Sequence, residues 1–159
     1  MSGVEITRHG PEVIDELRPF WLAMVAHHGE VAPEMGPLRP DDDSWAMRRA
    51  HYARQLARPG AFVLLARVED RPVGYALTTL EEASPTWSEP DGWAEIDSLA
   101  LLPNARGQGI GEALIERIQA EVGADRELRL YAMAGNIDAL RFYERAGFET
   151  AILVLRRPR

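Results

Sequence analysis

The alternation of apolar and polar residues predicts a strand and two helices in the first part of the chain. A short apolar stretch at 4–7 predicts a strand, and apolar residues at helical spacing through 11–28 predict a helix. A proline- and glycine-rich loop at 29–40 separates this helix from a second one at 41–58. N-cap chemistry and a negative first turn for the second helix are offered by Asp41, Asp42, Asp43 and Ser44.

The middle of the chain reads as a hairpin followed by a strand, a loop and a helix. Two β-rich runs at 62–68 and 73–80 are joined by a short polar connection, which predicts a hairpin. After a polar loop, an apolar run at 96–102 stops at a proline and predicts a buried strand. A glycine-rich loop at 106–111 leads into a helix, because apolar residues recur every four positions from Ile110 onward.

The last part of the chain predicts a strand, a helix and a final strand. Residues 128–133 read as a buried strand, and Asn136 can cap the helix that follows. Gly147 suits a left-handed cap at the end of that helix, and an apolar run at 148–155 predicts one more strand. The order β-α-α-β-β-β-α-β-α-β indicates a mixed α/β layer structure.

The glycine-rich loop has the character of an anion-binding site. Free amides at the start of a helix and the positive end of its dipole attract anions, and missing side chains let a phosphate approach. Arg106 adds a permanent cation at the mouth of this loop. A P-loop is excluded because the chain contains no lysine, and a dinucleotide fingerprint would need glycine where Glu112 stands.

Two motifs in this half of the chain resemble those of the GNAT N-acetyltransferases. Arg106-x-x-Gly109-x-Gly111, preceded by Leu-Pro and followed by an amphipathic helix, is similar to the family's pyrophosphate loop. The segment 136–148 is similar to its second motif. The resemblance implies a single GNAT-like domain over 1–159, with a mixed, largely antiparallel sheet flanked by helices. It also implies N-acetyltransferase activity with acetyl-CoA as co-substrate.

The resemblance carries over to particular residues that would bind the cofactor. Backbone groups of the strand should contact the pantetheine arm, the loop should hold the pyrophosphate, and two residues of the second motif should lie along the arm. In this sequence these residues are Leu99, Ala100 and Leu101 on the strand, Arg106, Gly107, Gln108, Gly109, Ile110 and Gly111 in the loop, and Asn136 and Tyr143 in the second motif.

Acetyl transfer from a thioester to an amine needs a base and an acid. An alkylamine with a pKa of about 10.4 is almost fully protonated at neutral pH, so a base must remove a proton before attack. The resemblance implies that Tyr143 protonates the leaving thiolate. For the base, Asp97 and Glu95 lie two apart on one strand and should share a face. Asp97 is the first choice because it precedes Arg106 by nine residues, as in polyamine-type members; Glu95 is the alternative. If both carboxylates share the site, their repulsion should raise the pKa of one of them.

Composition narrows the possible partners. Apolar residues make up 46% and charged residues 27% of the 159 residues, which is typical of one globular domain. A net charge of −7 argues against nucleic acid or an anionic membrane as partner. The absence of cysteine excludes a covalent thiol intermediate and a disulfide framework. His27 and His28 have no third ligand at helical spacing, so no metal is expected. With no export signal visible at the start, a cytoplasmic location is expected.

The acceptor is left open by the motifs. A small-molecule amine or a protein amino group is expected, and because relatives are often dimers the resemblance allows a homodimer. An alternative is a non-catalytic acyl-CoA-binding module that keeps the loop but not the chemistry. One hypothesis favours a cationic acceptor, because acidic residues gather before and on the catalytic strand and would attract cations. Those in the preceding loop are Glu81, Glu82, Glu89 and Asp91.

Overall fold

A computed structural model describes residues 3–88 and 92–158 of the chain. A five-stranded sheet runs in the order β1-β2-β3-β4-β5, in which neighbouring strands are antiparallel except for the parallel pair β4 and β5. The strands are β1 (Glu5–His9), β2 (Phe62–Val68), β3 (Arg71–Leu80), β4 (Trp93–Leu101) and β5 (Glu127–Leu130). The helices are α1 (Arg18–Val31), α2 (Asp41–Leu56), α3 (Ile110–Val122) and α4 (Ile137–Arg145), with 3-10 turns at Pro11–Leu17, Pro33–Met35 and Pro103–Ala105.

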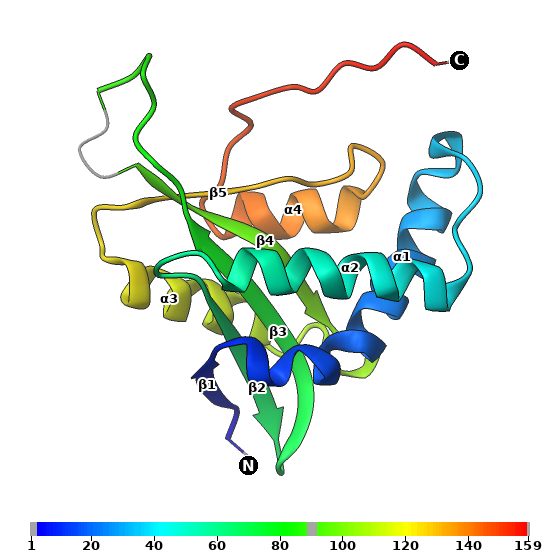
Figure 1. The fold of residues 1–159 in the computed structure, drawn as a ribbon, viewed down its shortest axis with the longest axis horizontal. Coiled ribbons are helices and arrows are strands. Elements are labelled where there is room, and N and C mark those ends of the chain that lie inside the picture. The colour runs from blue at the N-terminus through cyan, green and yellow to red at the C-terminus, as the bar shows by residue number, and fades with distance from the viewer. Residues whose placement is uncertain (1–2, 89–91, 159) are drawn as a thin grey trace.

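Helices cover both faces of the sheet. In Figure 1, α1 and α2 lie on one face and α3 lies on the other. β2 shows the consequence for the core, because five consecutive residues from Phe62 to Ala66 are buried. Val63 and Leu65 pack under α1 and α2, whereas Phe62 and Leu64 pack under α3. A strand with period-two side chains needs apolar residues at every position when both of its faces are covered.

β4 carries a β-bulge at Asp97. Ser98 pairs with Leu77 and Ile96 pairs with Thr78, so Asp97 is the extra residue between these two pairs. A bulge breaks the alternation of side chains. Asp97 and Ser98 therefore both contact α2, although they are consecutive in sequence.

β4 and β5 separate after a short parallel ladder. β4 follows β3 from Ala94 to Leu101 but pairs with β5 only from Trp93 to Ile96. Beyond Ile96, β4 has no β5 partner, and the backbone edge that would face β5 is free of strand pairing. Figure 1 shows α4 beside this divergence.

Three predictions about element ends are wrong. The helix predicted at 11–28 is a 3-10 turn followed by α1, because Pro19 in the first turn of α1 has no N–H to continue a ladder from the preceding turn. The N-cap position of α2 is Pro40 and makes no side-chain cap, although the acidic first turn is present. The strand predicted at 128–133 ends at Leu130, where the pairing with β4 stops.

The final strand predicted at 148–155 is also wrong. This segment has neither helix nor strand geometry, and Ile152, Leu153, Val154 and Leu155 are 68–90% exposed. Four consecutive apolar residues form a stable strand only if both faces are covered and a neighbouring strand accepts the backbone hydrogen bonds. No described strand pairs with this segment.

Candidate active site

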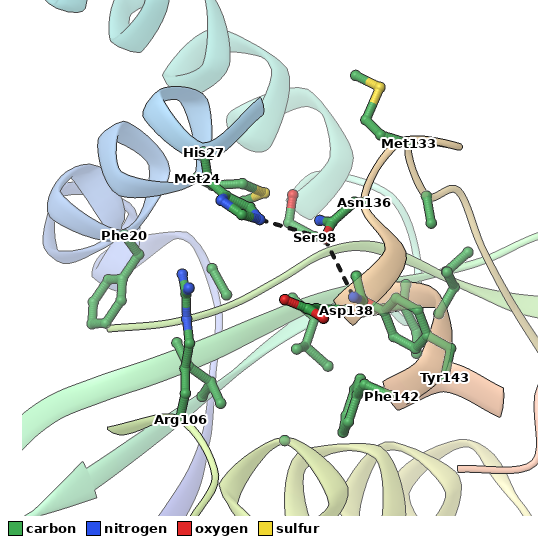
Figure 2. A pocket seen from close by; sticks show the side chains of 18 of the residues that line it. Phe20, Met24, His27, Ser98, Arg106, Met133, Asn136, Asp138, Phe142 and Tyr143 are labelled. Atoms are coloured by element: carbon green, nitrogen blue, oxygen red, sulfur yellow. Dashed lines mark hydrogen bonds between the residues drawn. The ribbon is translucent and has the colours of Figure 1, made fainter. Parts of the chain in front are cut away.

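A cavity of about 960 Å³ lies where β4 and β5 diverge. Its walls come from β4, the loop before α3, α4 and α1, as Figure 2 shows from close by. Most of the predicted site residues line it, with the exceptions of Glu95 and Gln108. The lining therefore brings together the strand, the glycine-rich loop and the second motif, although Asp97 and Tyr143 are 46 positions apart in sequence.

The glycine-rich loop presents an open backbone to this cavity. Gly107 and Gly109 have φ angles of 72° and 78°, which L-residues with side chains rarely adopt. An added Cβ at either position would meet no atom within 4 Å. Gly109 is the N-cap of α3, so the first amides of α3 follow directly from the loop. Arg106 is exposed, and Figure 2 shows its side chain extending from the loop toward Phe20 of α1.

The remaining loop residues have structural roles in this arrangement. The Gln108 side chain donates from Nε2 to the Asn104 carbonyl oxygen at 2.8 Å and so ties the turn together. Ile110 is buried in the core under the sheet. Gly111 lies against α4, where an added Cβ would come within 2.9 Å of the Phe142 ring. The loop is thus fixed to α3 at one end and to α4 across the cavity.

The free edge of β4 forms the second wall. Leu99, Ala100 and Leu101 line the cavity in the part of β4 that has no β5 partner. In a strand, alternate residues direct their N–H and C=O groups to the same side. This wall therefore combines apolar side chains with backbone donors and acceptors that no described strand uses.

α4 forms the third wall. Ala139, Phe142 and Tyr143 line the cavity on the apolar face of this helix, yet no residue of α4 is fully buried. Asn136 caps the helix as predicted, since its Oδ1 accepts from the Ala139 amide at 3.3 Å. The same Oδ1 lies 3.4 Å from Nε2 of His27 on α1, as the dashed lines of Figure 2 show. An apolar helix face that borders a cavity can bury more surface when a ligand enters.

Tyr143 keeps its proton at neutral pH. Burial raises the pKa of its hydroxyl to about 12, because the charged phenolate is poorly solvated at this position. Its ring contacts Phe142 and Phe148 with centroid distances of 5.1 and 5.7 Å. These two rings hold the phenol against the cavity.

Asp97 lies in the cavity wall and is held from α2. Its Oδ1 is 2.5 Å from Nε2 of His51, and its Oδ2 accepts from the Ser98 hydroxyl at 3.1 Å. Nη1 of Arg48 is 3.4 Å from the same Oδ2. The Ser98 hydroxyl in turn accepts from Tyr52, whose hydroxyl is 2.6 Å from that of Tyr75. A chain of hydrogen bonds thus joins the carboxylate to the core.

Glu95 does not line the cavity. Burial raises the pKa of its carboxyl, and the nearby charges of Glu81 and Asp97 raise it further. The expected sharing of one site by the two carboxylates is not observed, and burial rather than repulsion by Asp97 is the main cause of the raised pKa of Glu95. The two carboxylates differ in position: Asp97 faces the cavity and Glu95 lies before the bulge.

Sequence reasoning missed the contributions of α1 and α2. Phe20, Trp21, Met24, His28 and Arg48 all line the cavity, and His51 contacts Asp97. One signal was available, because Arg48, His51 and Tyr52 are spaced i, i+3, i+4 and so share a helix face. The face carries a cation, an imidazole and a phenol where a purely structural helix would have apolar residues.

The structure places only part of the acidic rim. Glu81 accepts from Arg58 at 2.7 Å and from the Thr79 hydroxyl at 2.7 Å, and both contacts lower the pKa of its carboxyl. Glu89 and Asp91 lie outside the described residues. Among the described lining residues, the acids Asp97, Glu112 and Asp138 are matched by the cations Arg48, Arg106 and Arg145.

Two further features concern metals and membranes. Residues 3–88 and 92–158 contain no group of three or more histidine, cysteine or acidic side chains placed to hold a metal ion. No helix within the same residues combines the length and apolarity that crossing a membrane requires.

Comparison with known families identifies this architecture. The family model described as "Acetyltransferase (GNAT) family" matches residues 20–148, which include α2, β4, the loop before α3, and α4. The chain belongs to the GNAT acetyltransferase family. The match confirms the resemblance that the two motifs indicated, and the observed sheet and helices confirm the predicted fold class.

Similar proteins include two mycothiol acetyltransferases. Over 163 residues the chain is 32% identical to a mycothiol acetyltransferase of Frankia casuarinae, a match that covers 95% of this chain and 43% of that protein. A mycothiol acetyltransferase of Kineococcus radiotolerans is 30% identical over 144 residues, which are 85% of this chain and 43% of that protein. The chain thus spans less than half the length of these two relatives.

Solved structures share the GNAT fold at low identity. A GCN5-related N-acetyltransferase from Ralstonia eutropha has a TM-score of 0.74 at 22% identity, and the match covers 98% of each chain. An aminoglycoside N-acetyltransferase in complex with CoA has a TM-score of 0.71 at 16% identity, covering 100% of this chain and 96% of that one. At such identities the likeness supports the fold.

Proposed function

We propose that this chain transfers an acetyl group from acetyl-CoA to an amine acceptor, by direct attack while both are bound. The acceptor is a small-molecule amine or a protein amino group. The observation that carries the proposal is that the open glycine loop, the unpaired edge of β4, Tyr143 and Asp97 all face one cavity. Membership of the GNAT family and the CoA complex of a structural neighbour support the same assignment.

The cavity walls fit the parts of acetyl-CoA. The amides from Gly107 to Gly111 and the Arg106 guanidinium would hold the pyrophosphate. The free backbone edge of Leu99, Ala100 and Leu101 would pair with the amides of the pantetheine arm. The apolar face of α4 would cover the arm from the other side, with Asn136 and Tyr143 along its length.

The reaction requires two protons to leave the acceptor nitrogen. Acetyl-CoA supplies a thioester whose C–S bond breaks as a C–N bond to the acceptor forms. A protonated amine carries three protons and the amide product carries one. We assign Asp97 to accept the proton that must leave before attack, because it is the carboxylate of the two candidates that faces the cavity. Tyr143 gives its proton to the departing sulfur, the second amine proton returns to the Tyr143 phenolate, and Asp97 releases the first proton to solvent.

The absence of cysteine makes direct transfer the simplest route. No thiol of this chain can carry the acetyl group, so we assign the attack on the thioester to the acceptor nitrogen itself. The raised pKa of Tyr143 keeps its phenol protonated at neutral pH, so that a proton is available when the thiolate leaves.

A panel of amines tests the proposal. Wild-type protein is incubated with acetyl-CoA and single amines from several classes: amino acids, amino acid amides, polyamines, aminoglycosides and short peptides. Released CoA is measured with a thiol reagent, which the protein itself does not consume because it has no cysteine. Turnover with at least one amine and acetylated product by mass supports the enzyme. Stabilisation by acetyl-CoA without turnover of any amine would favour the non-catalytic acyl-CoA-binding module.

A further inference from the structure

Arg48 places a cation at the α1 side of the cavity. Its guanidinium lies 3.8 Å from the centre of the Trp21 ring and 5.4 Å from that of Tyr52, so two aromatic side chains fix its position. The residue lines the cavity, and 27% of its side chain is exposed. Among the described residues, its polar contact is the 3.4 Å approach of Nη1 to Oδ2 of Asp97. A guanidinium has five N–H donors, and this contact uses one of them, so the other donors of Arg48 can bind a ligand.

The charges around Arg48 are not those of a site for a bare cation. Asp97 is the carboxylate in contact with Arg48, and it is already approached by His51. Burial lowers the pKa of His28, and the neighbouring charges of His27 and Arg48 lower it further. Arg48 therefore offers a partner for an anionic group, which an acceptor that carries only positive charge does not have.

We propose that the acceptor is a free α-amino acid with an apolar side chain, whose carboxylate binds Arg48 and whose amino group binds Asp97. This inference rests on the proposed function and names its substrate class. An α-amino acid carries its amino and carboxylate groups on one carbon, and Arg48 and Asp97 are a matching adjacent pair of opposite charge. Phe20, Trp21 and Met24 line the same side of the cavity and supply apolar surface for the side chain.

The proposal explains two features that a generic amine site leaves unused. The ion pair between Arg48 and Asp97 is loose at 3.4 Å and can open to admit a zwitterion. The carboxylate of the zwitterion then takes the place of Asp97 at Arg48, and its ammonium group takes the place of Arg48 at Asp97. The stacking on Trp21 keeps the guanidinium in place after Asp97 turns to the amino group. Neither feature is useful for a polyamine, which brings no carboxylate.

Three matched acceptors test the role of the carboxylate. L-phenylalanine, L-phenylalaninamide and phenethylamine share a ring and an amino group, but only the first has a carboxylate. We expect kcat/KM for L-phenylalanine to exceed the value for either of the others by about 10-fold or more, the size expected for a charged hydrogen bond. Spermidine serves as the purely cationic acceptor. If the amide, phenethylamine or spermidine is acetylated as well as L-phenylalanine, the proposal is overturned.

Variants of α2 connect that preference to Arg48. Arg48→Met keeps apolar contact with Trp21 but removes the donors, so it should erase the preference for L-phenylalanine over its amide. Arg48→Lys keeps the charge and should retain part of the preference. Arg49→Met is the matched control, because Arg49 is exposed, pairs with Asp15 at 2.6 Å and does not line the cavity. An unchanged preference in folded Arg48→Met and Arg48→Lys proteins would overturn the proposal.

A binding measurement separates this inference from the proposed function. Saturation-transfer NMR on cofactor-free protein should detect L-phenylalanine but not L-phenylalaninamide with wild type, and neither with Arg48→Met. Selective binding without turnover of any amine would overturn the proposed function while the recognition stands. Turnover of amines with no selectivity for the zwitterion, in binding or in kinetics, would overturn the inference alone.

Discussion

Nε2 of His51 lies 2.5 Å from Oδ1 of Asp97 and links α2 to the bulge of β4. The bulge turns Asp97 and Ser98 to the same side, and the Ser98 hydroxyl donates to the other carboxylate oxygen. His51 does not line the cavity, whereas Asp97 does. His51 therefore positions a residue of the cavity wall from behind, and its contribution to catalysis should be indirect.

The first prediction concerns this contact. Glutamine at position 51 can still donate an N–H to Asp97, so His51→Gln should keep kcat within a few-fold of wild type. His51→Leu removes the donor, and kcat should fall about 10-fold, since a lost hydrogen bond to a charged group weakens the position of the carboxylate. Steady-state kinetics should show an unchanged KM for acetyl-CoA in both variants. The control is His9→Leu on β1, where the side chain is 26% exposed against 30% for His51. Equal activity of His51→Gln and His51→Leu would contradict the positioning role.

The second prediction concerns the loop before α3. Acetyl-CoA at a hundredfold its dissociation constant should stabilise the wild-type fold by about 2.7 kcal/mol. Arg106→Ala should weaken acetyl-CoA binding by about 10-fold, because a charged contact to the pyrophosphate is lost, while an acetylated pantetheine fragment without phosphates should bind as before. Thermal unfolding with each ligand measures both effects. Arg71→Ala, at an exposed arginine of the β2–β3 hairpin outside the cavity lining, should leave both unchanged. No shift of wild type at millimolar acetyl-CoA would refute the loop's assignment.

The third prediction concerns the proton donor. Tyr143→Phe keeps the ring contacts with Phe142 and Phe148 but loses the hydroxyl, so kcat should fall about 10²-fold with little change in the affinity for acetyl-CoA. Because the pKa of Tyr143 is raised to about 12, its acid form persists across the usual assay range. Wild-type kcat should accordingly show no alkaline loss from this phenol below about pH 10. Rapid-quench or steady-state rates that match wild type would exclude Tyr143 as the acid.

Features that depend on local backbone chemistry could be predicted from the sequence. The loop from Arg106 to Gly111 and the cap at Asn136 lie where the motifs placed them, because glycine conformations and side-chain caps act within a few residues. The helical period located α3, the acidic start after a proline-rich loop marked α2, and the β-rich runs located β2 and β3. These elements are long and strongly patterned, so neighbouring structure did not override their local preference.

Features that depend on distant partners could not be predicted. The bulge at Asp97 exists because Ser98 and Ile96 pair with consecutive residues of β3, and the register of a ladder is not visible in one strand. Arg48 and His51 contact Asp97 from a helix 46 to 49 positions earlier in the sequence. From sequence alone, a charged residue on a helix is expected to face solvent. The final strand was wrong for the same reason, since an apolar run shows its own preference but not whether a partner strand exists.

The last prediction separates the two carboxylates of β4. Asp97→Asn should lower kcat by about 10²-fold and remove the acidic limb of the pH–rate profile, because the amide cannot accept the amine proton. Glu95→Gln should leave kcat nearly unchanged, since Glu95 does not line the cavity. The opposite pattern, with Glu95→Gln inactive and Asp97→Asn active, would reassign the base; if neither variant loses activity, another group or a water chain removes the proton.

Stability gives an independent test of the same pair. The pKa of Glu95 is raised in the folded protein, chiefly by burial, so its charge is disfavoured there. The protonated form of Glu95 therefore contributes fully to stability below the pKa of an unfolded glutamate, about 4.3. This contribution is lost as the pH rises through the pKa of Glu95 in the folded protein. Glu95→Gln should then unfold at a higher temperature than wild type at pH 7, and the gap should close as pH falls toward 4. Asp97→Asn should instead lose stability at pH 7, because the amide pairs less well with His51 and Arg48. Melting temperatures are measured for both variants across this pH range. If Glu95→Gln and Asp97→Asn change the melting temperature in the same way, the two carboxylates do not differ in environment as described.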